Sequence, residues 1–309
     1  STSSMNSIVV TTGQAFADID AVGCAIAYAE LLRVEGKSAE VVLPGTLNNS
    51  VSDSVRVWGL EYVTTPTNSE AEYVLVDVSD PAHIADCAKT GNVTEVYDHH
   101  PGFEQYWQEK IGAHSHIEPI GAAATLIWEE WKKRGQTEKI SEKSAKLLAV
   151  AILSNTLNFG AIITNDRDRV AYAELQSITP LSDEWIAQYF TEQETAVMQD
   201  VHQAIINDTK VLSIPGLPFT MTVGQLELWD GSAFLKTNTE AIESALKSFG
   251  EEHWIMSIPS LSEMKNHFYT KSEAVKELFT SGLDITFDGD YATSPRLWLR
   301  KEIIKQLSK

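Results

Sequence analysis

The chain has 309 residues, 43% of them apolar, which is enough for two domains with separate hydrophobic cores. Its formal net charge of −19 disfavours a broad nucleic-acid-binding surface, because such surfaces carry an excess of lysine and arginine. The sequence has no membrane-spanning apolar run and no secretory signal in the polar segment 1–6, so we expect no membrane contact. Cys24 and Cys87 lack metal-type spacing, and we expect a cytoplasmic protein in which both thiols are reduced.

The first half of the chain alternates short apolar runs with helical periods, which is typical of a parallel sheet with crossing helices. Strands are predicted at 7–11, 39–42, 73–76 and 94–97. Helices are predicted at 21–35, near 82–88, and at 121–134, 141–154 and 166–176. Ser141 is a suitable N-cap for the helix at 141–154.

The second half of the chain shows a different pattern. A helical stretch at 183–206 leads into predicted strands at 211–214, 219–223 and 252–258, with a helix at 239–249 between them. We therefore predict an α/β protein of two domains, a parallel-sheet domain over residues 1–188 and a smaller α/β domain over residues 192–309.

Side chains that bind metal ions follow three of the predicted strands. The strand at 7–11 leads to Asp18 and Asp20, the strand at 73–76 leads to Asp77, and the strand at 94–97 leads to Asp98, His99 and His100. Ligands of open α/β sheets bind at the carboxyl ends of the strands, so we expect these groups to lie together. Carboxylates gathered in this way repel one another unless cations neutralise them, and mixed oxygen and imidazole ligands suit Mg²⁺, Mn²⁺, Co²⁺ or Zn²⁺. Two such ions about 3.5 to 4 Å apart are common where displacement at phosphorus is catalysed.

These motifs, together with Ala151-Ile-Leu-Ser-Asn155-Thr-Leu-Asn-Phe159 and the late pair Arg300-Lys301, resemble those of the DHH-superfamily phosphoesterases. The similarity spans residues 8–305 and is greatest to the branch of family II inorganic pyrophosphatases and short-chain, prune-like exopolyphosphatases. It implies a hydrolase that cleaves the phosphoanhydride bonds of pyrophosphate or short polyphosphate with a water activated by two divalent ions, Mg²⁺ or Mn²⁺ and in some cases Co²⁺. It also implies an active site in a cleft between the two domains.

The resemblance assigns metal ligands in the first domain. Asp18 matches a ligand of the first metal, and Asp20 and His99 match ligands of the second. Asp77 matches the carboxylate that bridges both metals.

The resemblance also implies residues that act on the substrate. His100 matches the residue that touches the substrate phosphate, and we expect Asp98 to hold His99 in the required tautomer and to help orient the attacking water. Candidates for substrate binding in the second domain are Lys210, Arg300, Lys301 and His267.

Several positions depart from the pyrophosphatase pattern. Gln14 stands where the first metal usually has a histidine, and Asn155 stands where the second metal usually has an aspartate. Both amides offer a carbonyl oxygen as a metal ligand, but neutral oxygen binds Mn²⁺ or Co²⁺ less tightly than imidazole does. Gln14 favours the exopolyphosphatase branch and a Mg²⁺-type site, whereas Asn155 removes a negative charge. Gly160 and Glu302 replace two lysines and favour a substrate other than compact pyrophosphate.

Other interpretations stay open at this point. Asp18 and Asp20 also suit the start of a helix, the two histidines also suit a surface turn, and Arg300-Lys301 also suits a solvated terminal helix. One alternative function is a nucleotide phosphodiesterase, which the acidic balance and the lack of a Gly-Gly-His motif disfavour. Another is a catalytically weakened protein that binds phosphate compounds or protein partners. The expected ligand is pyrophosphate or short polyphosphate, with no nucleic acid, and the chain is a monomer or a homodimer.

Overall fold

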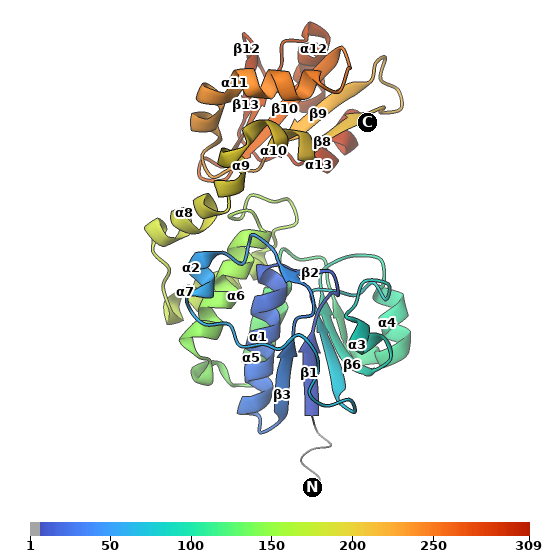
Figure 1. Ribbon diagram of the computed structural model, residues 1–309, viewed down its shortest axis with the longest axis vertical. Coiled ribbons are helices and arrows are strands. Elements are labelled where there is room, and N and C mark those ends of the chain that lie inside the picture. Colours follow the sequence, from blue (N-terminus) through green and yellow to red (C-terminus); the bar gives the residue numbers. More distant parts are fainter. Residues whose placement is uncertain (1–6) are drawn as a thin grey trace. The chain divides into compact units, whose positions relative to one another are not determined.

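A computed structural model describes residues 7–309, which form two units that divide between Ile186 and Ala187 (Figure 1). The polar segment 1–6 lies outside the described residues. None of the described helices has the length and apolar character that a membrane crossing requires. Both units contain a sheet with helices packed against it, which confirms the predicted α/β class.

The first unit is built on a five-stranded parallel sheet with the order β3-β1-β5-β6-β7. Its strands are β1 (Ser7–Thr11), β3 (Ser38–Val42), β5 (Glu72–Val76), β6 (Asn92–Asp98) and β7 (Ser115–Ile117). The four predicted strands are confirmed, and β7 adds an edge strand. The chain leaves β1 toward β3 on one side and reaches β5 on the other, so the strand order reverses at β1. Parallel sheets bind ligands beyond the carboxyl ends of the strands at such a reversal.

Helices cover both faces of this sheet (Figure 1). They are α1 (Ile19–Val34), α2 (Asp53–Arg56), α3 (Asp86–Lys89), α4 (Glu104–Ile111), α5 (Ala123–Lys133), α6 (Glu142–Asn155) and α7 (Asp166–Ile178), and a short strand pair, β2 (Phe16–Ala17) and β4 (Thr46–Leu47), lies beside them. Helix α1 is buried on nearly every side because it packs against the sheet, α5 and α6. On the opposite face, Val9, Leu75 and Val96 of the strands pack with Trp107 of α4.

Two local predictions for the first unit can be compared with the structure. Ser141 caps α6 as expected, with its Oγ accepting a hydrogen bond from the Ser144 amide at 3.1 Å. The helix predicted near 82–88 is wrong in extent, since only α3 is helical there. The residues before α3 are not helical, and Ile84 among them forms a β-bridge with Gly13.

The second unit contains a six-stranded mixed sheet with the order β12-β13-β11-β10-β9-β8. Its strands are β8 (Thr209–Leu212), β9 (Met221–Gln225), β10 (His253–Ser260), β11 (Lys265–Tyr269), β12 (Phe287–Asp288) and β13 (Tyr291–Ser294). Its helices are α9 (Thr195–Gln199), α10 (Val201–Asn207), α11 (Gly231–Lys247), α12 (Glu273–Leu283) and α13 (Arg300–Leu307). Helices α12 and α13 share one apolar core with the sheet, and α10 and α11 share the other.

The continuous helical stretch predicted at 183–206 is wrong. It is divided into α8 (Asp183–Glu192), α9 and α10. A new helix begins after Asp200, because its carboxylate accepts a hydrogen bond from the Gln203 amide at 3.1 Å and caps α10. The helix predicted at 239–249 is the second half of α11, which starts at Gly231 and is kinked at Asn238.

Candidate metal centre

The carboxyl ends of β1, β5 and β6 bring the acidic and imidazole groups together. Asp18 and Asp20 lie at the start of α1, Asp77 follows β5, and Asp98 ends β6. Asp77, Asp98, His99 and His100 each place one potential ligand atom within 4.8 Å of the others. Asp20 Oδ2 lies 3.5 Å from His99 Nε2 and so joins the same group.

The two aspartates at the start of α1 have different surroundings. Asp18 is the N-cap of the helix, and its Oδ1 accepts a hydrogen bond from the Ala21 amide at 2.8 Å. Asp20 is completely buried, and its oxygens accept hydrogen bonds from the Ala123 and Ala124 amides, both at 2.9 Å, at the start of α5. Burial raises the pKa of Asp20 to about 6. The capping interpretation therefore applies to Asp18, whereas Asp20 points into the cluster.

Asp77 occupies a strained and buried position. Its φ of 57° lies in the left-handed region, which aspartate tolerates better than most side chains. Only 5% of its side chain is exposed, and its Oδ1 lies 3.2 Å from His99 Nε2. Burial, together with the charges of Asp20 and Asp18, raises the pKa of the Asp77 carboxyl well above its ordinary value. A nearby cation would reverse this effect, because it favours the ionised carboxylate.

His99 presents its Nε2 to these carboxylates. Its Nδ1 donates a hydrogen bond to the Ile120 carbonyl at 2.9 Å, which leaves Nε2 as the ring nitrogen that faces the cluster. Within residues 7–309, neither Nε2 nor Asp77 Oδ1 has a hydrogen-bond partner. A cation bound between these two atoms would give both of them a partner. The orphaned atoms and the mixed nitrogen and oxygen donors therefore fit a divalent metal ion.

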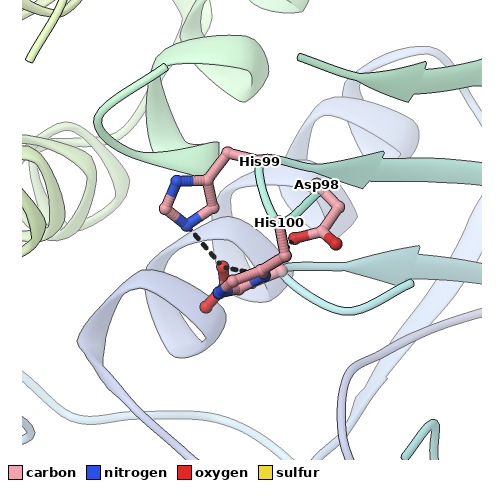
Figure 2. A group of neighbouring side chains, drawn as sticks. Asp98, His99 and His100 are labelled. Carbon is pink, nitrogen blue, oxygen red and sulfur yellow. Dashed lines mark hydrogen bonds and ion pairs between the residues drawn. The ribbon is translucent and has the colours of Figure 1, made fainter. Parts of the chain in front are cut away.

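The Asp98 carboxylate is hydrogen-bonded to the ring of His100 and not to the ring of His99, which corrects the expected tautomer role (Figure 2). Figure 2 shows the His99 ring turned away from the Asp98 carboxylate. Instead, His100 Nδ1 donates to Asp98 Oδ1 at 2.7 Å. Burial opposes ionisation of Asp98, but this hydrogen bond and the charge of His100 outweigh it, so the pKa of Asp98 is lowered. The same bond raises the pKa of His100, whose side chain is 59% exposed.

The two amides that depart from the pyrophosphatase pattern are both hydrogen-bonded within the protein. Gln14 Oε1 accepts a hydrogen bond from the Asp86 amide at 2.8 Å, at the start of α3. Asn155 Nδ2 donates to Asp20 Oδ2 at 2.8 Å. Asn155 therefore lies in the cluster, whereas the carbonyl oxygen of Gln14 is held by another element.

A cavity of about 700 Å³ opens beside the cluster, within the first unit. Its lining includes Gln14, Asp18, Asp77 and His100. It also includes two basic side chains that were not predicted as site residues, His83 and Lys89.

The candidate residues of the second unit differ in exposure and partners. Lys210 on β8 and Lys301 on α13 are exposed. The Arg300 side chain is 12% exposed, and its guanidinium donates to the Oδ1 and the backbone carbonyl of Asp208, both at 2.9 Å. His267 lies on β11 and is buried against Glu263, with Nε2 and Oε1 3.0 Å apart.

The sequence interpretation missed Asp168, a completely buried carboxylate near the start of α7. It accepts hydrogen bonds from the Gly121 amide at 2.8 Å, the Ala122 amide at 3.3 Å, the Thr125 hydroxyl at 2.6 Å and the Asn165 amide at 2.8 Å. The available signal was the pair Asn165 and Asp168, which form a capping box at α7. Asp168 thus holds the amides of the two residues that precede α5, and the first two amides of α5 hold Asp20.

Residues 7–152 match the model of the DHH family, N-terminal domain. The chain is 25% identical over 307 residues to a protein of Exiguobacterium sp. named "Probable manganese-dependent inorganic pyrophosphatase", with 96% of each sequence covered. A Bacillus mycoides protein of the same name is 32% identical over 173 residues, which is 55% of each sequence.

Two solved structures share the fold. A Methanococcus jannaschii protein provisionally assigned to the family II inorganic pyrophosphatases superimposes with a TM-score of 0.55 at 20% identity, covering 98% of this chain and 99% of that one. An exopolyphosphatase-related protein of Bacteroides fragilis gives a TM-score of 0.53 at 13% identity, covering 97% of this chain and 89% of that one. These two likenesses show the fold, and the family match identifies residues 7–152 as a DHH-family domain, which confirms the resemblance seen in the motifs of the first unit.

Proposed function

We propose that this chain is a metal-dependent hydrolase that cleaves the phosphoanhydride bond of inorganic pyrophosphate. The observation that carries the proposal is the convergence of His99 Nε2 on Asp77 Oδ1 at 3.2 Å and Asp20 Oδ2 at 3.5 Å, beyond the carboxyl ends of parallel strands. Relatives over the full length are named manganese-dependent inorganic pyrophosphatases, which supports both the substrate and the metal.

Asp20, Asp77 and His99 would hold divalent metal at this position, with Mn²⁺ or Mg²⁺ as the expected ions. When bound, such ions neutralise phosphate oxygens and lower the pKa of a coordinated water toward neutrality. The protein's part is to fix the ligands before the substrate arrives. The Ile120 carbonyl fixes the His99 ring, and the first amides of α5 fix Asp20.

His100 and Asp98 are proposed to act on the substrate. Because the raised pKa of His100 favours its protonated form, Nε2–H can donate a hydrogen bond to a phosphate oxygen. The buried Asp98 carboxylate holds the ring through Nδ1 and keeps its orientation fixed. His100 and Asp77 line the same cavity, which supports a contact between His100 and a substrate phosphate.

The cavity supports the inclusion of short polyphosphates among the substrates. Its volume of about 700 Å³ lies within the usual range for small-molecule sites, and Lys89 and His83 add basic groups to its wall. Lys210 and Lys301 are proposed as additional phosphate contacts, since both are exposed. Nucleic acid is not proposed as a substrate, because the net charge of −19 would repel a long polyanion.

A second candidate function is a phosphate-binding protein with weak turnover. The hydrogen bonds of Gln14 to Asp86 and of Asn155 to Asp20 favour it, because both amides are engaged within the protein. Both functions require the protein to bind pyrophosphate, but only the hydrolase releases phosphate from it at an appreciable rate.

The deciding assay is phosphate release from pyrophosphate, tripolyphosphate and a dinucleotide, each with Mg²⁺, Mn²⁺ and Co²⁺. We expect release from the first two substrates and a loss of at least about 100-fold in kcat for Asp77→Asn, because asparagine keeps the left-handed backbone but removes the ligand charge. Asp53→Asn, an exposed change in the same unit, is the matched control. Binding of pyrophosphate without release would favour the second function, and equal rates for Asp77→Asn and wild type would refute the assigned site. Light scattering of the same preparation tests the homodimer.

A further inference from the structure

The potential ligand atoms around His99 are spaced as neighbours around one metal ion. Asp77 Oδ1 and Asp20 Oδ2 lie 3.2 and 3.5 Å from His99 Nε2, and the Asn155 amide lies 2.8 Å from Asp20 Oδ2. Two ligands at right angles around an ion with bonds of about 2.1 Å are about 3 Å apart. We propose that the substrate-free protein holds one resident divalent ion at this position, and not the two that the resemblance implies.

Asn155 is placed to be the fourth protein ligand of this ion. Its Nδ2 donates to Asp20 Oδ2 at 2.8 Å, which is the contact expected between an amide and a carboxylate. A half-turn of the amide exchanges nitrogen and oxygen and brings Oδ1 to the same point. The ion then replaces the hydrogen bond as the link between Asn155 and Asp20, with no change in backbone position.

The position beside Asp18 lacks a comparable set of ligands. Gln14 Oε1 accepts the hydrogen bond from the Asp86 amide, and a half-turn of its amide would set an NH₂ group against that N–H. The Gln14 backbone is also fixed, because its own amide donates to the His83 carbonyl at 3.0 Å. Asp18 Oδ1 is used as the cap of α1. A second ion here would have few protein ligands beyond Asp77, which it would share with the first.

Charge balance leads to the same result. Among residues 7–309, no lysine or arginine forms an ion pair with Asp18, Asp20 or Asp77. One divalent ion balances Asp20 and Asp77, since His99 and Asn155 are neutral ligands. The Asp98 carboxylate is paired with His100 at 2.7 Å, so only the charge of Asp18 remains. A second divalent ion would exceed this charge and would need an anion to accompany it. If the proposed function is correct, pyrophosphate supplies that anion, and the second ion binds with the substrate.

The test is a count of bound Mn²⁺ on the full chain, first stripped with a chelator and then titrated while the EPR signal of free Mn²⁺ is recorded. We expect one tightly bound ion per wild-type chain. His99→Ala should abolish it, whereas Asp18→Asn should leave one ion, because asparagine still caps α1. Circular dichroism confirms that each variant is folded. The double variant Gln14→His/Asn155→Asp should bind two ions, since it adds an imidazole ligand and a negative charge.

Several results would overturn the proposal. Two ions bound with similar affinity by the wild type, no ion bound, or loss of the ion in Asp18→Asn would each contradict it. When the count is repeated with imidodiphosphate, a non-hydrolysed analogue of pyrophosphate, the number of bound Mn²⁺ ions per chain should rise from one to two. An unchanged number would refute the proposal that the second ion binds with the substrate. Because the first count needs no turnover, its failure is separate from a failure of the pyrophosphatase assay.

Discussion

Replacing Asp168 by asparagine is predicted to destabilise the first unit, because this buried carboxylate accepts four hydrogen bonds. The best orientation of the asparagine keeps its oxygen toward the Gly121 and Asn165 amides and turns its NH₂ toward Thr125, whose hydroxyl can reverse and accept. The two retained bonds then lose their charge assistance, at about 1 kcal/mol each, and the Ala122 amide loses its acceptor, at about 1 kcal/mol more. We expect a loss of about 3 kcal/mol.

For a unit of this size, 3 kcal/mol corresponds to a decrease of about 6 to 12 °C in Tm. Differential scanning calorimetry measures this decrease, with Asp166→Asn, an exposed change in the same helical turn, as the control. Hydrogen exchange should also quicken at residues 121–124, and Mn²⁺ affinity should fall, since the Ala123 and Ala124 amides hold Asp20. If Asp168→Asn melted at the same temperature as Asp166→Asn, the four hydrogen bonds could not have the energetic role assigned to them.

Three further predictions concern the pair at the end of β6, the basic residues of α13 and the start of α5. Because the hydrogen bond that His100 donates to Asp98 raises the pKa of His100, protonated His100 persists above its ordinary range and is lost as the pH rises through the raised value. In Asp98→Asn the alkaline limb of kcat/KM should therefore move to lower pH, and an unmoved limb would show that His100 does not control it. Arg300→Ala should lower the free energy of unfolding in urea by about 1 to 2 kcal/mol, because it removes the contacts with Asp208. Lys301→Ala should change that free energy by less than about 0.5 kcal/mol and raise the KM for pyrophosphate. Equal stabilities of the two variants would contradict a structural role for Arg300 alone. A Cβ at Gly121 would lie 2.6 Å from Asp168 Oδ2 and from Thr156 Cγ2, so Gly121→Ala should cost about 1 to 3 kcal/mol, and a wild-type Tm would show that the neighbours yield freely.

The location of the site could be predicted because its determinants are local. Each of the strands β1, β5 and β6 is a short apolar run, and each is followed within a few residues by a carboxylate. The alternation of strands and helices makes the sheet parallel, and parallel strands carry such residues to the same edge. Neither step requires knowledge of a distant contact, so the positions of Asp18, Asp77 and Asp98 followed from the pattern.

The hydrogen bonds within the site could not be predicted in the same way. His99 is fixed by the carbonyl of Ile120, and Gln14 is bound to the amide of Asp86, which is 72 residues away. Backbone groups exist at every position, so no residue type marks the one that will be used. The assignment of Asp98 to His99 was wrong for this reason, since adjacency in sequence suggested a contact that the direction of the side chains does not allow.

The start of α5 shows how stability and function are joined in this fold. The amides at this point belong to Gly121 and Ala122, which precede the helix, and to Ala123 and Ala124, its first two residues. Ala122 at the cap position makes no side-chain hydrogen bond to them. A helix start without such a cap needs acceptors from elsewhere. Two buried carboxylates supply them, Asp168 from α7 and Asp20 from α1. Burial raises the pKa of Asp20, and the hydrogen bonds from the Ala123 and Ala124 amides oppose this effect. The contact that completes α5 therefore also favours the charged form of Asp20 and holds it toward the candidate metal position.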